Sequence, residues 1–159
     1  MPFSYPCGTW TSMTQRVSNR GQSSQSNVPE KNEHLVMKSL NIRGLQSIKT
    51  YVKWKYLLSL KDKADVLGLQ ETHNSAIFDA WKYFGIKSFS SSTSTGKGGV
   101  SLIFFHPSTI ITSTQILIPN YAILVNTKIK EQSFTFINIY IPPGNLSLEN
   151  RFWKKCHRL

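Results

Sequence analysis

Two polar side chains that could take part in chemistry follow predicted strands of this sequence. Glu71 comes after the apolar run 64–70, and Asn41 lies near the end of an earlier apolar stretch, residues 35–42. A short apolar run with polar flanks is typical of a strand covered on both faces. The carboxyl end of such a strand is a frequent functional position in α/β proteins. Two simpler roles stay open: Glu71 as a solvated loop residue, and Asn41 as a turn residue bonding its own backbone.

The segment between these two strands decides whether Asn41 and Glu71 can meet. Residues 47–60 carry apolar side chains at three- and four-residue spacing, which predicts a helix. The apolar set is Ile48, Tyr51, Val52, Tyr56, Leu57 and Leu60. Lys49, Lys53, Lys55 and Lys61 take much of the other face, which we expect to be solvated. Strand, helix and strand over this length form a βαβ unit with parallel strands, so both carboxyl ends share one edge.

The rest of the chain predicts one more short helix, a series of strands and a final helix. Residues 74–85 have the spacing of an amphipathic helix, and Gly96–Gly99 predict a tight turn. That turn is no phosphate-binding P-loop, because Gly98 rather than Ser or Thr follows Lys97. Predicted strands then cover 100–105, 110–118, 121–129 and 133–140. Ser147 could cap a last helix that turns Leu148, Phe152 and Cys156 toward the core.

The charge of the chain points to a polyanionic partner. The 159 residues hold 19 Lys and Arg against 8 Asp and Glu, a formal net charge of +11. Residues 1–33 are rich in Ser, Gln, Asn and Thr and are predicted to be disordered, which leaves 34–159 as one domain. A basic domain favours nucleic acid, although a generally basic protein or one that meets an anionic membrane surface has the same excess.

Cysteine content and hydropathy exclude several classes of protein. Cys7 and Cys156 lie far apart, which argues against a disulfide scaffold and a zinc module and fits a reducing compartment. No apolar stretch approaches the ~20 residues of a membrane helix, and no secretory signal is visible. We therefore expect an intracellular protein, nuclear or cytoplasmic, that is neither secreted nor bound to a membrane.

Four motifs in order carry a family resemblance. They are Ser39-Leu40-Asn41-Ile42-Arg43-Gly44-Leu45, Leu69-Gln70-Glu71-Thr72-His73, Gly98-Gly99-Val100-Ser101-Leu102-Ile103-Phe104 and Phe136-Ile137-Asn138-Ile139-Tyr140-Ile141-Pro142. The pattern resembles the endonuclease/exonuclease/phosphatase superfamily, and more closely the apurinic-type endonuclease domain of non-LTR (LINE-type) retrotransposons. It covers roughly residues 35–155. Each motif alone is weak, and the four in this order are fairly specific.

The resemblance implies a fold, a cofactor and a set of site residues. The fold is a four-layered α/β sandwich, with two packed mixed sheets flanked by helices and the site where strand ends converge. Glu71 matches the ligand of a divalent metal, usually Mg²⁺ (or Mn²⁺), and Asn41 matches the residue that helps hold the metal and the scissile phosphate. Tyr140 matches the tyrosine that approaches the phosphate, and Asn138 matches a position of structural support. The implied partner is DNA, and the implied reaction is nicking by phosphodiester hydrolysis.

This sequence also departs from the family pattern. Family members continue with Asp-x-Asn and Asp-His motifs that activate water and stabilise the transition state, but no Asp follows Asp79 here. The later histidines, His106 and His157, lack the matching context. We therefore expect a partial sandwich, truncated at its C-terminus. The missing C-terminal half, or a reverse-transcriptase region of the parent element, is a possible partner.

Three functions follow from the matches and departures. The first is a truncated metal-dependent DNA-nicking endonuclease with weak or no activity alone. The second is a non-catalytic, basic nucleic-acid-binding fragment, and the third is a phosphoesterase relative acting on other substrates.

Overall fold

A computed structural model describes residues 34–45, 50–73, 81, 84–92 and 97–157. Its elements in chain order are β1 (Met37–Asn41), α1 (Thr50–Ser59), β2 (Val66–Gln70), β3 (Lys87–Ser91), β4 (Val100–Phe104), β5 (Ile110–Ile118), β6 (Ala122–Ile129), β7 (Gln132–Ile139) and α3 (Leu146–Cys156). The predicted disorder of residues 1–33 and most of the predicted helix 74–85 lie outside the described residues. No helix of the described part is long and apolar enough to cross a membrane.

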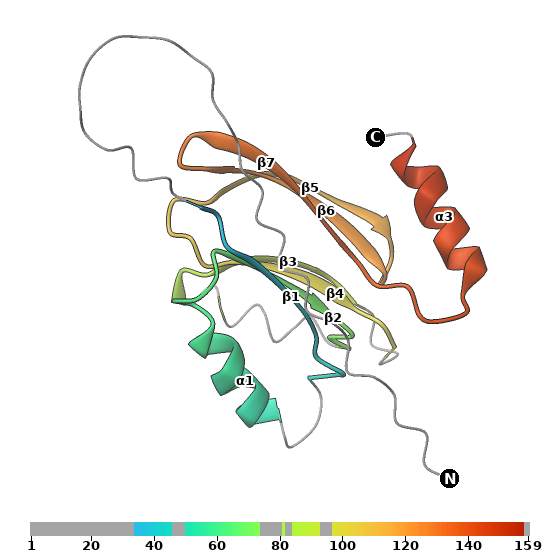
Figure 1. The fold of residues 1–159 in the computed structure, drawn as a ribbon, viewed down its shortest axis with the longest axis horizontal. Coiled ribbons are helices and arrows are strands. Elements are labelled where there is room, and N and C mark those ends of the chain that lie inside the picture. The colour runs from blue at the N-terminus through green and yellow to red at the C-terminus, as the bar shows by residue number, and fades with distance from the viewer. Residues whose placement is uncertain (1–33, 46–49, 74–80, 82–83, 93–96, 158–159) are drawn as a thin grey trace.

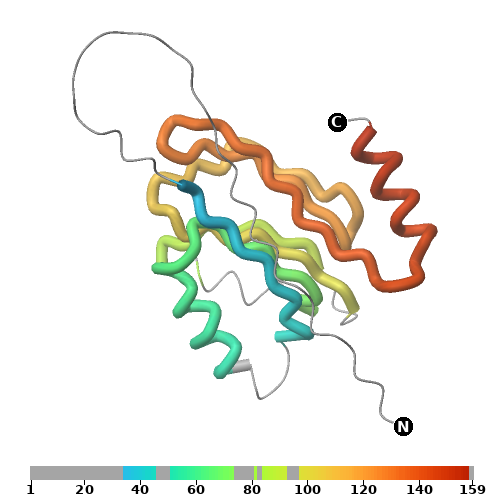
Figure 2. Tube along the Cα trace, viewed as in Figure 1, coloured from blue at the N-terminus to red at the C-terminus, as the bar shows by residue number. Residues whose placement is uncertain are grey.

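The strands form two sheets that pack face to face between the two helices (Figure 1). One sheet has the order β1-β2-β4-β3 and is mixed, because β1 and β2 are parallel and the other pairs are antiparallel. The other sheet is the antiparallel meander β5-β6-β7. In the tube view, α1 lies outside the first sheet and α3 outside the second (Figure 2). The predicted α/β sandwich with helices on its outer faces is thereby confirmed.

Apolar alternation along the strands fills the three spaces between these layers. Between the sheets pack Val66, Val100, Leu102 and Phe104 of one sheet with Ile123, Val125, Ile129 and Phe136 of the other. Leu117, Ile118, Ala122 and Leu124 on the outer side of the meander meet Leu148 and Phe152 of α3. As predicted, α3 buries Leu148 and Phe152, but its N-cap is Asn145 rather than Ser147. The Asn145 side chain accepts the backbone N–H of Leu148 at 3.0 Å.

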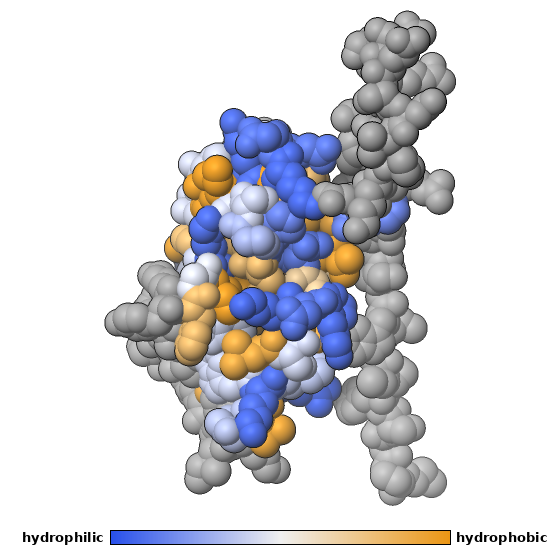
Figure 3. Space-filling view, turned by 90° about the vertical axis from the view of Figure 1, so that its left-hand side faces the viewer, coloured by the Kyte–Doolittle hydropathy of each residue, from blue (hydrophilic) through white to orange (hydrophobic). Residues whose placement is uncertain are grey.

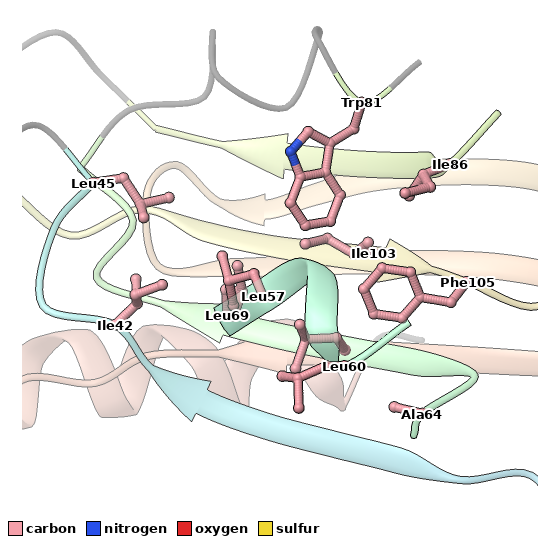
Figure 4. Close-up of a cluster of buried hydrophobic side chains, with 11 residues drawn as sticks. Ile42, Leu45, Leu57, Leu60, Ala64, Leu69, Trp81, Ile86, Ile103 and Phe105 are labelled. Atoms are coloured by element: carbon pink, nitrogen blue, oxygen red, sulfur yellow. The ribbon is translucent and has the colours of Figure 1, made fainter. Parts of the chain in front are cut away.

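Helix α1 packs on the first sheet through part of the predicted apolar face and through residues outside it. Leu57 and Leu60 are buried there with Leu69, Ile103 and Trp81 (Figure 4). The predicted core residues Tyr51, Val52 and Tyr56 are 66%, 70% and 47% exposed. The buried side instead includes half-buried Lys53 and Trp54, and the Trp54 and Trp81 rings lie 5.0 Å apart. The rotation of the helix is therefore set by its contact with the sheet. The number of apolar residues on each face does not set it.

Strand β3 was not predicted from its sequence. Lys87–Ser91 is polar and serine-rich, and such composition is typical of a loop. In the structure it pairs along its whole length with β4, with Phe89 opposite Leu102. As an edge strand it needs few apolar side chains, because it has only one strand neighbour.

Candidate functional site

The carboxyl ends of β1 and β2 bring Asn41 and Glu71 together, as the predicted βαβ unit requires. The two strands are in parallel register, with Asn41 opposite Gln70. The Asn41 side-chain N–H donates to Glu71 Oε1 at 2.8 Å. Asn41 Oδ1 accepts the backbone N–H of Arg43 at 3.1 Å. Thus the side chain of Asn41 makes the turn contact expected of an asparagine and also orients the carboxylate.

Tyr140, just beyond the end of β7, reaches the same carboxylate from the second sheet. Its hydroxyl lies close enough to the Glu71 carboxylate to shift the pKa of both groups. Its backbone N–H donates to the carbonyl of Tyr121 at 2.8 Å, and the two tyrosine rings stack with centroids 6.4 Å apart. Three polar side chains from three strand ends, separated by up to about a hundred residues in sequence, therefore meet at one edge.

The surroundings of the site shift the pKa values of Glu71 and Tyr140 in opposite directions. Partial burial raises the pKa of Glu71, but hydrogen bonds from Tyr140 and Asn41, together with the nearby side chains of His73 and Arg43, outweigh it and lower that pKa. Burial, the hydrogen bond to Glu71 and the charge of its carboxylate raise the pKa of Tyr140 to about 12. At neutral pH the site thus holds a carboxylate beside a protonated phenol.

Asn138 lies below this group and joins the two sheets. It is 4% exposed, and its side-chain N–H groups donate to the carbonyls of Leu69 and Ser101, both at 2.8 Å. Its Oδ1 accepts the side-chain N–H of Gln70 at 2.6 Å. These bonds tie β7 to β2 and β4 directly beneath the strand end that carries Glu71.

The loops around the site have unusual backbone conformations. Arg43, Glu71 and His73 all have positive φ, at 51°, 53° and 57°. Non-glycine residues adopt this region rarely, and such residues are concentrated at functional sites. Gly99 lies against the same loop at φ 96°, and a Cβ there would stand 2.4 Å from Thr72 Oγ1 and 2.9 Å from His73 N. Glycine is therefore required at position 99 by the close approach of two loops, whereas Gly96, the start of the predicted turn, lies outside the described residues.

Lys53 is the residue of this region that the sequence did not single out. The predicted solvated face of the helix included it, but that prediction is wrong for Lys53. Its ammonium donates to the carbonyls of Ile42, Arg43 and Gly44 at 2.8, 3.1 and 2.6 Å. No sequence signal distinguished it from Lys49, Lys55 and Lys61, because its partners are backbone groups of a separate loop.

The donors at this edge suit one kind of metal ion. In the described part of the chain no three His, Cys, Asp or Glu side chains form a group that could hold a metal. A zinc site built from such side chains is therefore not present there. One carboxylate with an amide and a phenol is compatible with Mg²⁺, which keeps several waters and takes substrate phosphate oxygens as ligands.

Comparisons with known proteins identify the fold. No protein-family model matches the chain, and no curated protein matches it. Among solved structures it is similar to the endonuclease domain of TRAS1, a telomere-specific non-LTR retrotransposon, with TM-score 0.54 and 15% identity over 77% of this chain and 54% of that one. It is also similar to TDP2 of D. rerio humanized by 14 mutations, with TM-score 0.58 and 14% identity over 78% of this chain and 57% of that one. The chain thus spans little more than half the length of each, and it has an endonuclease/exonuclease/phosphatase-type fold.

Proposed function

We propose that this chain is part of a metal-dependent phosphodiesterase domain of retrotransposon origin that nicks DNA. The observation that carries the proposal is the convergence of Asn41, Glu71 and Tyr140 at one edge of the sandwich. Residues 34–159 would form the amino-terminal part of that domain. The similarity in fold to the TRAS1 endonuclease domain is compatible with this function.

In this proposal Glu71 is the principal ligand of Mg²⁺ or Mn²⁺. Its lowered pKa keeps it ionised, which metal binding requires. Asn41 holds the carboxylate in place and keeps one Oδ1 lone pair for the metal or its water. When bound, the cation would neutralise charge on the phosphate oxygens of the substrate.

Tyr140 is proposed to donate a hydrogen bond to a phosphate oxygen. A pKa of about 12 keeps its hydroxyl protonated across the physiological range. Its present acceptor is Glu71, so a phosphate bound beside the carboxylate would lie within reach of the same donor. Asn138 supports the site from below without contacting the substrate.

DNA is the proposed substrate, and the net charge of +11 favours a polyanion. The sequence supplies no Asp after Asp79 that could orient the attacking water, so we expect this chain alone to nick slowly or not at all. That expectation keeps a second candidate function, a basic nucleic-acid-binding fragment without catalysis. A phosphoesterase acting on substrates other than nucleic acid is a third.

A nicking assay on supercoiled plasmid with Mg²⁺ tests the proposal. The variant is Glu71→Ala, and the matched control is Glu131→Ala, because both are glutamates with positive φ (53° and 65°). Nicking by the wild type and Glu131→Ala that is lost in Glu71→Ala supports catalysis. Plasmid binding that weakens steeply with salt, without Glu71-dependent nicking, favours the binding fragment instead. If the protein neither nicks nor binds the plasmid, a nucleic-acid function is contradicted.

A further inference from the structure

The ammonium of Lys53 meets three carbonyls of the loop between β1 and α1. Its donors reach Ile42, Arg43 and Gly44 at 2.8, 3.1 and 2.6 Å. The left-handed backbone at Arg43 and Gly44, with φ of 51° and 82°, accompanies this arrangement. One half-buried cation therefore satisfies three consecutive peptide carbonyls, a task that water or separate side chains usually share.

The N–H groups of the same three peptide units all point into the candidate site. The unit with the Ile42 carbonyl donates its N–H, that of Arg43, to Asn41 Oδ1 at 3.1 Å. The unit with the Arg43 carbonyl donates the Gly44 N–H to the carbonyl of Glu71 at 2.6 Å. The unit with the Gly44 carbonyl donates the Leu45 N–H to the carbonyl of Thr72 at 3.1 Å.

This pairing links Lys53 to the metal-binding edge without direct contact. A peptide group whose carbonyl accepts a charge-assisted bond becomes a stronger donor at its N–H, and such bonds strengthen one another in series. Each of the three series begins at Lys53 and ends on Asn41 or on the backbone of Glu71 or Thr72. Lys53 on α1 is thus linked through these peptide groups to the side chain of Asn41 and the backbone of Glu71.

We propose that Lys53 is a positioning residue that fixes Asn41 and Glu71 in the geometry that binds a divalent cation. The proposal rests on the proposed function for its metal, but the geometry that it explains does not. In this proposal Lys53 would touch neither the metal nor the substrate. Its side chain is fully engaged with backbone carbonyls on the inner side of the loop.

The test compares Lys53→Met with Lys55→Met, which removes the same charge from the exposed face of the same helix. Lys55 lies over the Tyr51 ring, 4.8 Å from its centroid, away from the loop. Mn²⁺ is the probe, with free ion measured by electron paramagnetic resonance. Loss of residues that orient metal ligands weakens metal binding by about 10- to 100-fold. We expect about 10-fold weaker Mn²⁺ binding for Lys53→Met and wild-type binding for Lys55→Met. Circular dichroism should show that both variants are folded.

A second variant and a second measurement keep the test decisive. Lys53→Arg keeps the charge, but its planar fork matches three converging carbonyls poorly, so we expect intermediate Mn²⁺ affinity. Amide hydrogen exchange at Arg43, Gly44 and Leu45 should be accelerated in both Lys53 variants and unchanged in Lys55→Met. Wild-type affinity together with wild-type exchange in Lys53→Met and Lys53→Arg would overturn the inference.

The proposed function can fail separately. If the wild type binds no Mn²⁺ in a Glu71-dependent way, the metal site is refuted. Hydrogen exchange, together with an NMR titration of the Glu71 carboxyl, then still decides whether Lys53 positions these residues. In that case a pKa of Glu71 that is the same in Lys53→Met and in the wild type would refute the positioning role as well.

Discussion

Strand β2 has an acidic residue beyond each of its ends, Asp65 before Val66 and Glu71 after Gln70, and the two carboxylates have opposite surroundings. Asp65 Oδ2 accepts the backbone N–H of Val36 at 2.7 Å. The Asp65 backbone also bonds both neighbouring strands, donating to the Val36 carbonyl and accepting from Phe105 N–H, each at 2.8 Å. Glu71 instead receives side-chain donors, Asn41 and Tyr140.

The Asp65 end also has a hollow. A cavity of about 280 Å³ lies there, lined by residues that include His34, Asp65, His106 and Lys130. Hydrophilic surface surrounds smaller apolar patches at this end of the sandwich (Figure 3). The proposed function nevertheless uses the other end, because the Asp65 carboxylate accepts a backbone N–H whereas the Glu71 carboxylate is faced by the polar side chains of Asn41 and Tyr140. The proposal therefore rests on the surroundings of each acid and not on the presence of a hollow.

The largest expected effect concerns the close contact between two loops at the Glu71 end. Gly99→Ala places a Cβ 2.4 Å from Thr72 Oγ1 and 2.9 Å from His73 N, at φ 96°. We expect the free energy of unfolding to fall by about 4 kcal/mol, measured by urea denaturation. Gly144→Ala is the control, because φ is 78° there and nothing lies within 4 Å. It should cost only about 1 kcal/mol of left-handed strain, and equal losses in both would remove the clash from the explanation.

The second prediction tests the support beneath Glu71. Asn138→Ala removes the side-chain donor to the buried carbonyls of Leu69 and Ser101 and one of the two acceptors of the Gln70 amide. We expect a loss of about 3 kcal/mol in the free energy of unfolding. Asn126→Ala is the control, since Asn126 lies in the same sheet and makes two side-chain bonds but is only half-buried. Its loss should stay below about 1 kcal/mol, and a comparable loss would show that burial does not distinguish the two asparagines.

The sequence predicts those features of the Glu71 end that depend on contacts between residues close in the chain. The apolar runs at 64–70 and 133–140 predict strands, and the parallel βαβ unit places Asn41 beside Glu71 because connection length and handedness leave few other topologies. Asn138 was assigned a structural place by resemblance alone, and its side-chain bonds from β7 to the opposite sheet agree with that role. The predicted roles of Glu71 and Tyr140 in metal and phosphate binding stay predictions.

What the sequence did not reveal depends on contacts between distant segments. In the sequence Lys53 resembles the other lysines of its helix. Its three acceptors are backbone carbonyls that come together only when the loop is folded. The exposed side chains of Tyr51, Val52 and Tyr56 suggested another helix face, because their apolar character says nothing about which side meets the sheet. Edge strand β3 has loop-like composition, and its pairing with β4 supplies the bonds that its own residues do not predict.

The third prediction sets the two acids directly against each other. Asp65→Ala removes the acceptor of the Val36 N–H and should lower the free energy of unfolding by about 1.5 kcal/mol. Glu71→Ala removes a partly exposed acceptor of side-chain bonds and should lower it by no more than about 0.5 kcal/mol. Mn²⁺ binding should show the reverse order, retained in Asp65→Ala and lost in Glu71→Ala. The same order in both measurements would contradict the division of roles.

The smallest expected effect is on titration. Tyr140→Phe removes a donor that lowers the pKa of Glu71, so that pKa should rise toward its ordinary value of 4.5, as measured by NMR titration of the carboxyl. A lowered folded-state pKa stabilises the protein above the unfolded value, and that contribution disappears as the pH falls through the folded value. The stability advantage of the wild type over Tyr140→Phe at neutral pH should therefore shrink on acidification.

The alkaline side gives the opposite sign for the same substitution. Because the pKa of Tyr140 is raised to about 12, its contribution is complete below 10 and lost as the pH rises from 10 through about 12. Tyr140→Phe should lack this loss, whereas Tyr121→Phe, which alters only the ring stacked on Tyr140, should keep it. If both variants followed the wild type at both extremes of pH, Tyr140 and Glu71 would not be coupled. The Glu71 carboxylate would then be held by Asn41 without a contribution from Tyr140.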